Sequence, residues 1–271
     1  MYYTPDYALS TIGFDPSRAY DPHITLAQTM GATVSSDHRE RITLLGCGHY
    51  AERVINGITG EGVSVIARDV NAAIGESRFE STGTRVFFRG DSELWANRIK
   101  DDSGWFFTRS GGAYAALKVA GGGYNVTDQT YRWERGRPAF LVDSPHGYYL
   151  ELENKWAPVV LQMGRAADYE SFEDFMASVR ANRFEYAGSD YAYGEDRSED
   201  GILTYTSEAG DTYTYYARSI RLPRINGEEV NLNPEKTFES PFLSMTHGET
   251  TATISYPGYE DLVLEFGITD R

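Results

Sequence analysis

Short segments in which apolar and polar residues alternate recur along almost the whole chain, separated by turn residues. The clearest are "TYTYYAR" at 212–218 and "TATISYPGYEDLVLEF" at 251–266. Because successive side chains of a strand point to opposite faces, such alternation predicts half-buried β-strands. The turn sequences "AGD" at 209–211, "NG" at 226–227 and "PG" at 257–258 predict hairpins. About eighteen strands are predicted in this way, which indicates an all-β protein.

One segment departs from this pattern and predicts a helix near residues 171–182. In "DYESFEDFMASVRANRF" the apolar residues Phe172, Phe175 and Val179 recur at helical spacing. Ser171 is of the residue type that caps helix N-termini. The single apolar stripe predicts a helix that packs on a sheet. The residues that follow, 187–201, are polar and acidic and include glycine, which predicts an exposed loop.

These elements predict a single domain over residues 1–271. The strands number about twice the seven to nine of an immunoglobulin-size sandwich. Hydrophobic residues make up 41% of the chain and charged residues 24%, as in globular proteins that bury a core. We therefore expect an all-β fold, a large two-sheet antiparallel β-sandwich with one short packed helix.

The stretch "SGWFFTRSGGAYAALK" at 103–118 predicts a hairpin with Ser110-Gly111-Gly112 at its turn. Trp105, Phe107 and Arg109 then share one face of the first strand. If that face is the core, Arg109 must leave it at the rim or pair with a carboxylate. If that face lines a cleft, Trp105 and Arg109 are candidates for ligand contact.

The net charge of the chain narrows the classes of partner. At −15 it repels nucleic acid and anionic membranes, so we expect neither as a partner. No apolar run reaches the roughly 18 residues of a membrane-spanning helix. The first residues, "MYYTPDYALS", lack the basic and apolar regions of a signal peptide. These residues already have the pattern of a strand, a proline turn and a second strand, so we expect a further segment upstream.

Cysteine and histidine give little sign of reactive chemistry. The single cysteine, Cys47, allows no intrachain disulfide and is interpreted as a buried structural thiol. None of the five histidines is spaced from another as zinc ligands are. We expect no metal site and no cofactor. Arg89-Gly90-Asp91 is interpreted as a hairpin turn.

Several stretches together carry a resemblance to a known family. They are "TPDYALS" at 4–10, "GWFFTRSGGAYAALK" at 104–118, "APVVLQMGRAADYESFEDFMASV" at 157–179, "RINGEEVNL" at 224–232, "FESPFLS" at 238–244 and the 251–266 stretch quoted above. In these, the chain resembles the C-terminal β-sandwich portion of bacterial proteins similar to heparinase II/III-type polysaccharide lyases. The resemblance covers roughly residues 1–267.

In that family a helical toroid precedes a sandwich of the supersandwich type, and the catalytic cleft lies between the two. A tyrosine and a histidine transfer protons there, while an Asn, His or Arg neutralises the uronate carboxylate. The resemblance thus implies a secreted or periplasmic, carbohydrate-active protein whose partner is an acidic polysaccharide or oligosaccharide. It also implies that this chain is completed by a helical toroid domain or a partner subunit.

A lyase that works by β-elimination needs a base, an acid and a cation. The stretch "DSPHGYYLELE" at 143–153 is the richest in such groups. We take His146 as the candidate acid or base, Tyr148 as the candidate donor and Arg109 as the candidate cation. The alternative is a turn histidine followed by two tyrosines, one facing each side of a sheet.

Sugar contacts are predicted mainly in "YRWERGRP" at 131–138. Sugar rings stack on aromatic faces, and arginines bind their hydroxyls or carboxylates. The candidate substrate-binding residues are therefore Trp105, Tyr131, Trp133, Arg135 and Arg137. The alternative for this stretch is an exposed loop whose tryptophan folds back on the sandwich.

Two function classes stay open at this stage. The first is the β-sandwich domain of a polysaccharide lyase-like enzyme, and the second is a non-catalytic sugar-binding or structural module. A concave face on which His146, a tyrosine and an arginine converge would favour the enzyme.

Overall fold

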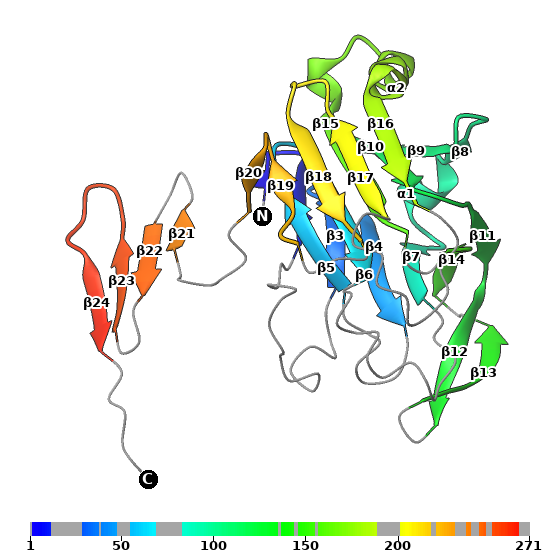
Figure 1. The fold of residues 1–271 in the computed structure, drawn as a ribbon, viewed down its shortest axis with the longest axis horizontal. Helices are drawn as coiled ribbons and strands as arrows, with labels where there is room; N and C mark the ends of the chain where they lie inside the picture. Colours follow the sequence, from blue (N-terminus) through cyan, green and yellow to red (C-terminus); the bar gives the residue numbers. More distant parts are fainter. Residues whose placement is uncertain are drawn as a thin grey trace. The chain divides into compact units, whose positions relative to one another are not determined.

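The structure of the chain is a computed structural model (Figure 1). It describes residues 2–11, 29–37, 39–47, 55–68, 83–134, 137–143, 146–154, 157–188, 201–217, 221–230, 237–239, 244–247 and 251–265. The chain divides into two compact units, Met1–Val230 and Asn231–Arg271, where the sequence analysis expected one domain. Each unit is described by itself.

The larger unit is built mainly from three antiparallel sheets, which we call the flanking, central and outer sheets. The flanking sheet has seven strands in the order β1-β2-β3-β4-β7-β14-β11. Its strands are β1 (Tyr2–Tyr3), β2 (Tyr7–Ser10), β3 (Thr29–Val34), β4 (Arg41–Cys47), β7 (Gly83–Arg89), β14 (Gly147–Leu152) and β11 (Tyr124–Thr127).

The central sheet has six strands, the outer sheet has five, and a separate ribbon has two. In spatial order, the central sheet contains β5 (Ile55–Thr59), β6 (Val63–Arg68), β15 (Val159–Arg165), β10 (Ala113–Val119), β9 (Trp105–Ser110) and β8 (Ile99–Lys100). The outer sheet contains β16 (Arg183–Ala187), β17 (Ile202–Thr206), β18 (Thr212–Tyr216), β19 (Arg224–Ile225) and β20 (Glu228–Glu229). The ribbon pairs β12 (Gln129–Glu134) with β13 (Arg137–Asp143).

The flanking and central sheets pack face to face and enclose the main core. Alternate residues of the flanking strands, such as Leu9, Leu44 and Phe88, are buried against alternate residues of the central strands, such as Leu117 and Leu161. This interdigitation of two apolar faces is what holds a β-sandwich together. The all-β antiparallel sandwich predicted from the alternation is confirmed.

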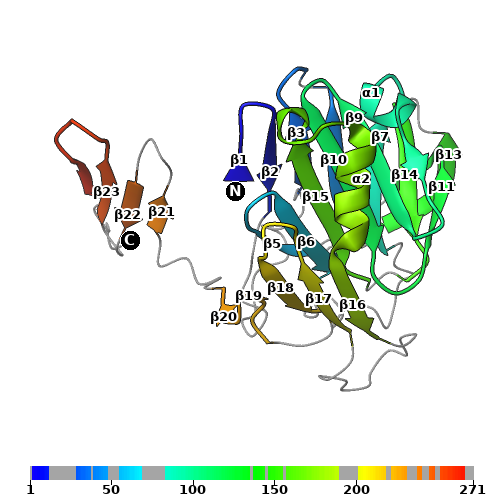
Figure 2. The same ribbon diagram turned by 90° about the horizontal axis from the view of Figure 1, so that it is seen from above.

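The opposite face of the central sheet is buried as well. Neighbouring residues of β9 point to opposite sides, so Phe106 joins the main core while Phe107 packs edge-on against Phe175 of α2 (Phe172–Ala181). Trp105, on the same side as Phe107, contacts Phe184 and Tyr205 of the outer sheet. Helix α2, which was predicted to pack on a sheet, and the outer sheet, a third sheet that the sequence did not predict, therefore form a layer that covers the central sheet (Figure 2).

Helix α2 matches the helix predicted near residues 171–182. The Ser171 side chain accepts a hydrogen bond of 3.1 Å from the backbone N–H of Asp174, which confirms the predicted cap. The buried residues of the helix are Phe172, Phe175, Met176 and Val179. Within the described ranges, neither α-helix has the length and apolarity that crossing a membrane requires.

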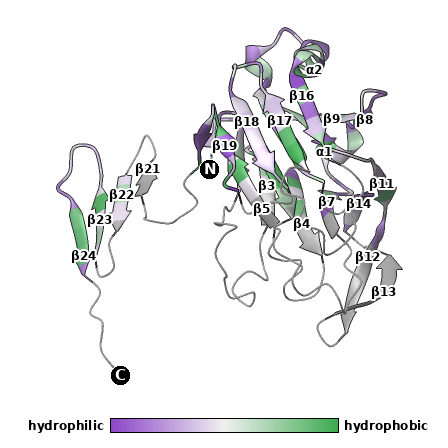
Figure 3. Ribbon diagram, in the orientation of Figure 1, coloured by the Kyte–Doolittle hydropathy of each residue, from purple (hydrophilic) through white to green (hydrophobic). Residues whose placement is uncertain are grey.

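The hairpin turns predicted at 209–211 and 226–227 are confirmed. In the outer sheet β17 and β18 pair from Thr206 opposite Thr212, and Asn226 and Gly227 turn between β19 and β20 with φ of 54° and 82°. At the edge of the outer sheet, β16 is hydrophilic over much of its length (Figure 3) and carries the Arg183–Glu185 ion pair. Charges of this kind protect a sheet edge from pairing with another chain. Most of the predicted acidic loop, residues 189–200, lies outside the described residues.

The smaller unit contains one antiparallel sheet of four strands, in chain order. Gly258, with φ of 85°, lies in the predicted turn before its last strand. Ala252 is buried, whereas Val263 and Tyr259 are exposed. The strands are β21 (Thr237–Glu239), β22 (Ser244–His247), β23 (Thr251–Ser255) and β24 (Leu262–Glu265).

The segment 93–100 forms helix α1 (Glu93–Ala96) followed by β8. Ser92 caps α1 through a hydrogen bond from the N–H of Trp95. The buried Glu40 carboxylate accepts two more, from the N–H groups of Glu93 and Leu94, both at 3.0 Å. A carboxylate at a helix N-terminus stabilises even a short helix, and the distant Glu40 could not be read from the local pattern.

Asp101 joins the start of the β9–β10 hairpin to α2. Its carboxylate accepts hydrogen bonds from the N–H of Trp105 at 3.3 Å and from Arg180 Nε at 2.6 Å. Burial alone would raise the pKa of Asp101, but hydrogen bonds from Ser103 and Arg180 outweigh it and hold the pKa below its usual value. Asp101 therefore stabilises the fold above its unfolded pKa of about 3.9, and this contribution is lost as the pH falls through its folded pKa.

We predict that Asp101→Asn lowers the free energy of unfolding by about 1–2 kcal/mol at neutral pH. The difference from wild type should shrink as the pH falls below about 4, where the wild-type carboxylate also becomes neutral. Denaturant unfolding across pH measures both effects. Asp102→Asn is the matched control, because the neighbouring Asp102 is exposed. A deficit in Asp101→Asn that is constant from neutral to acid pH would contradict this account.

Candidate functional site

A concave surface of about 420 Å³ lies beside the adjoining ends of β7 and β14. We call it the His146 hollow. Two of the three predicted catalytic residues, His146 and Tyr148, line it. Its full lining is Arg89, Gly90, Asp91, Asp128, His146, Gly147 and Tyr148.

Close pairing of β7 with β14 positions the hollow. Gly147 lies opposite Arg89, and the N–H of Gly90 donates to the His146 carbonyl at 3.1 Å. A Cβ on Gly147 would lie 2.0 Å from the Phe88 carbonyl oxygen, so only glycine allows this approach. The missing side chain thus brings His146 beside Arg89.

The side chains of the hollow differ in how firmly they are held. The Tyr148 ring stacks on Trp95, with ring centres 4.2 Å apart and planes 12° apart. The packing of that ring against the main core fixes Tyr148, while His146 is exposed at the turn. One wall of the hollow is therefore preorganised and the other faces solvent.

Arg89 and Asp91 form a two-point ion pair in the hollow. Arg89 Nε lies 2.9 Å from Asp91 Oδ1, and Arg89 Nη2 lies 3.1 Å from Asp91 Oδ2. This hydrogen-bonded pairing raises the pKa of the Arg89 guanidinium and lowers the pKa of the Asp91 carboxyl. Both groups are charged at neutral pH, and Asp128 adds a second carboxylate.

The Arg89-Gly90-Asp91 turn leads into α1 and not into the return strand of the predicted hairpin.

Arg109 does not reach this hollow. Its guanidinium lies 5.2 Å from the ring centre of Phe172, on the side of the central sheet that α2 covers. Tyr148 faces the other side of that sheet, in the main core. The face that Trp105, Phe107 and Arg109 share is therefore an interior face. The exposed Arg109 leaves it at the rim, as expected for the case in which this face is the core.

Trp105 likewise lies away from any sugar-accessible surface. The side chain is 2% exposed, because the outer sheet covers its ring. It therefore packs as a core residue and presents no free face to a ligand, contrary to the substrate-binding role expected for it.

The remaining predicted sugar-binding residues lie on or beside the two-stranded ribbon. Trp133 pairs with Pro138, next to a register shift between Arg132 and Trp133, so the backbone here is a hairpin and not a loop. Arg135 lies outside the described residues, as do the side chains of Tyr131, Trp133 and Arg137. The predicted sugar contacts of these four residues remain predictions.

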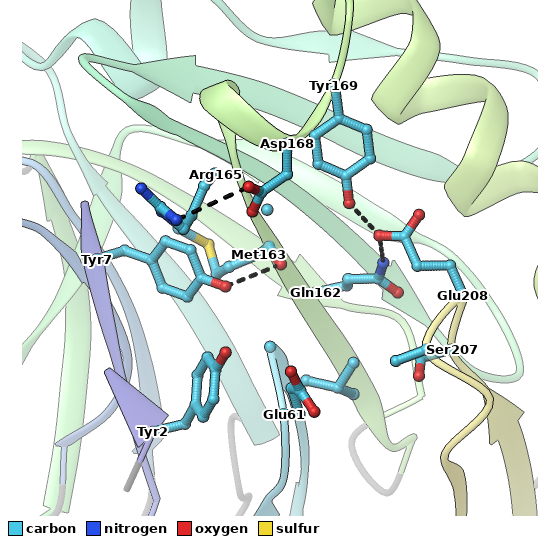
Figure 4. Close-up of a pocket in the computed structure, with 14 residues that line it drawn as sticks. Tyr2, Tyr7, Glu61, Gln162, Met163, Arg165, Asp168, Tyr169, Ser207 and Glu208 are labelled. Carbon is cyan, nitrogen blue, oxygen red and sulfur yellow. Dashed lines mark hydrogen bonds and ion pairs between the residues drawn. The ribbon is translucent and has the colours of Figure 1, made fainter. Parts of the chain in front are cut away.

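A second concave site, which the sequence analysis missed, is shown in Figure 4. Its residues come from segments far apart in the sequence, among them Tyr7, Glu61, Gln162 and Glu208. One local signal existed: Gln162 and Arg165 interrupt the otherwise apolar run "VVLQMGR" of a doubly buried strand. A polar residue in such a strand needs a partner, so it marks a site.

Comparisons of the chain with protein-family models, with curated proteins and with solved structures found no match. The family resemblance therefore stays an expectation drawn from the residues quoted above.

We predict that Gly147→Ala destabilises the protein by about 1–3 kcal/mol, because its methyl group must push β14 away from β7. Gly90→Ala is the matched control in the same hollow, since its Cβ would meet nothing closer than a Tyr148 ring carbon at 3.4 Å. Thermal and denaturant unfolding of both variants measures the difference. Equal stability of the two variants would show that close strand pairing does not shape the hollow.

Proposed function

We propose that this chain is the β-sandwich domain of a carbohydrate-active, polysaccharide lyase-like enzyme that binds an acidic glycan at the His146 hollow. One observation carries the proposal: His146, Tyr148 and Arg89 line the same concave surface. These are the three group types that β-elimination needs, with Arg89 in place of the expected Arg109. The family resemblance supports the same substrate class.

In the proposed reaction, the neutral imidazole of His146 removes the proton from the carbon next to the uronate carboxylate. The electron pair left on that carbon forms a double bond as the neighbouring carbon–oxygen bond breaks. The Tyr148 hydroxyl gives its proton to the departing sugar oxygen. Arg89 pairs with the carboxylate and stabilises the negative charge that develops on it.

Arg89 must exchange Asp91 for the substrate carboxylate in this reaction. The ion pair is exposed, with 41% and 56% of the two side chains accessible to solvent, so solvent screens it and it can be exchanged at little cost. A helical toroid domain or a partner subunit would supply the opposite wall of the cleft, as the resemblance implies.

The charge of the hollow favours a second candidate, a non-catalytic sugar-binding module. Two carboxylates, Asp91 and Asp128, face a single guanidinium, Arg89. An excess of carboxylate oxygens suits hydroxyl groups better than a polyanion. A module of this kind would retain glycans without cleaving them.

The test is to incubate the protein with several polyuronates and follow the ultraviolet absorbance of an unsaturated uronate. We expect Tyr148→Phe and His146→Gln each to slow product formation by about 100-fold or more. Tyr148→Phe keeps the ring that stacks on Trp95, so its melting temperature should stay close to that of wild type. Arg109→Met is the control and should retain activity.

Retention on immobilised glycans separates the remaining outcomes. Retention without any absorbance change would support the sugar-binding module in place of the lyase. Neither cleavage nor retention on any polyuronate or neutral glycan would overturn the carbohydrate proposal as a whole.

A further inference from the structure

The second concave site, which we call the Tyr7 pocket, encloses about 130 Å³. At about 30 Å³ for each water molecule in the liquid, this is room for about four waters, so the pocket takes part of a sugar-sized ring. The carboxylates of Glu61 and Asp168 and the hydroxyls of Tyr2 and Tyr7 point toward its centre (Figure 4). Its lining is Tyr2, Tyr7, Glu61, Gly62, Val63, Gln162, Met163, Gly164, Arg165, Asp168, Tyr169, Ser207, Glu208 and Ala209.

One wall of the Tyr7 pocket is fixed by a hydrogen-bond network around Glu208. This carboxylate accepts hydrogen bonds from the hydroxyls of Tyr169 and Ser178 and from Gln162 Nε2. Gln162, only 2% exposed, in turn accepts from Asn182 at 3.1 Å. Burial and the Glu208 hydrogen bond raise the pKa of the Tyr169 hydroxyl. These hydrogen bonds hold the Glu208 carboxylate in position.

Other polar groups of the pocket have no partner within the described part of the chain. The Ser207 side chain is 6% exposed, and its buried hydroxyl makes no hydrogen bond. Glu61 itself has no hydrogen bond or ion pair from its carboxylate among these residues. Buried polar groups are nearly always satisfied in a protein, so the Ser207 hydroxyl points to a ligand that bears hydrogen-bonding groups, and the exposed Glu61 carboxylate is open to the same ligand.

The charges of the pocket select the sign of that ligand. Glu61, Asp168 and Glu208 face one cation, Arg165. Arg165 is already held by Asp6, with Nε 2.8 Å from Oδ2, and lies 3.7 Å from Asp168. Carboxylates therefore outnumber guanidinium groups three to one, so the pocket favours a cation over the acidic glycan proposed for the His146 hollow.

A metal ion does not fit the pocket. Among the described residues, no group of three or more carboxylate, histidine or cysteine side chains is arranged to hold one. The half-buried Tyr2 ring, whose centre lies 6.3 Å from that of the buried Tyr7 ring, instead offers an aromatic face. Such faces attract organic cations and pack against the C–H groups of a sugar ring.

We infer that the Tyr7 pocket binds a small organic cation on a hydroxylated frame, of the class of an amino sugar with a free amino group. The ammonium group pairs with Glu61, and the ring hydroxyls hydrogen-bond with Ser207 and the tyrosine hydroxyls. The pocket shares no lining residue with the His146 hollow, so this inference stands apart from the proposed function.

Three probes with the same ring size and different charge test the inference. They are glucosamine, which is cationic, N-acetylglucosamine, which is neutral, and glucuronate, which is anionic. Calorimetric titration of the full chain at low salt should show the tightest binding for glucosamine. We expect Glu61→Gln to weaken it by about tenfold or more, the loss of one charge-assisted hydrogen bond, and Ser207→Ala to weaken it several-fold.

Two controls make the result decisive. Glu260→Gln removes the same charge from an exposed position of the smaller unit and should leave binding unchanged. Tyr148→Phe, in the His146 hollow, should also leave it unchanged. The inference is overturned if no probe binds, if N-acetylglucosamine or glucuronate binds as tightly as glucosamine, or if Glu61→Gln binds like wild type with an unchanged melting temperature.

Discussion

The larger unit depends on one constraint: its central sheet must be covered on both faces. In an ordinary antiparallel sandwich each strand is apolar on one side and polar on the other. In β15 every residue from Val159 to Gly164 is buried, so both faces need a protein layer. The flanking sheet supplies one layer, and α2 with the outer sheet supplies the other. Removing either would expose aromatic and aliphatic side chains to water.

This layering also decides what the surface can do. The side chains of Trp105, Phe107 and Phe175 are buried between the central sheet and the outer layer, so none of them is free to bind a ligand. The candidate binding sites therefore lie where layers or strands end. The His146 hollow forms beside two paired strands of the flanking sheet. The Tyr7 pocket forms where flanking strands, the end of β15 and the outer sheet meet, and Gln162 is the buried polar residue that β15 contributes to its lining.

Local patterns predicted the hairpins and α2 because their causes are local: Asn226-Gly227 adopts positive φ, and Ser171 caps the helix. They could not predict that a third sheet joins α2 in covering the central sheet, since periodicity shows that a face is apolar but not what covers it. The sequence pattern likewise indicated Arg109 as the candidate cation and Arg89 only as part of a turn. The hollow brings Arg89 beside His146 through strand pairing over a long sequence separation. The Tyr7 pocket is lined by Glu61, Gln162 and Ser207 from three separate segments. Of these three, only Gln162 stands out in the sequence, because it is a polar residue in an otherwise apolar strand.

The double burial of the central sheet can be tested with two neighbouring residues of β9. Phe106 is 3% exposed and faces the flanking sheet, whereas Phe107 is 0% exposed and faces α2. The measurement is the free energy of unfolding of Phe106→Ala and Phe107→Ala in denaturant. The account predicts that each variant loses about 3–5 kcal/mol, because each leaves a cavity in a packed layer. A Phe107→Ala variant within about 1 kcal/mol of wild type would contradict it, since that is the cost of truncating a residue on an open face.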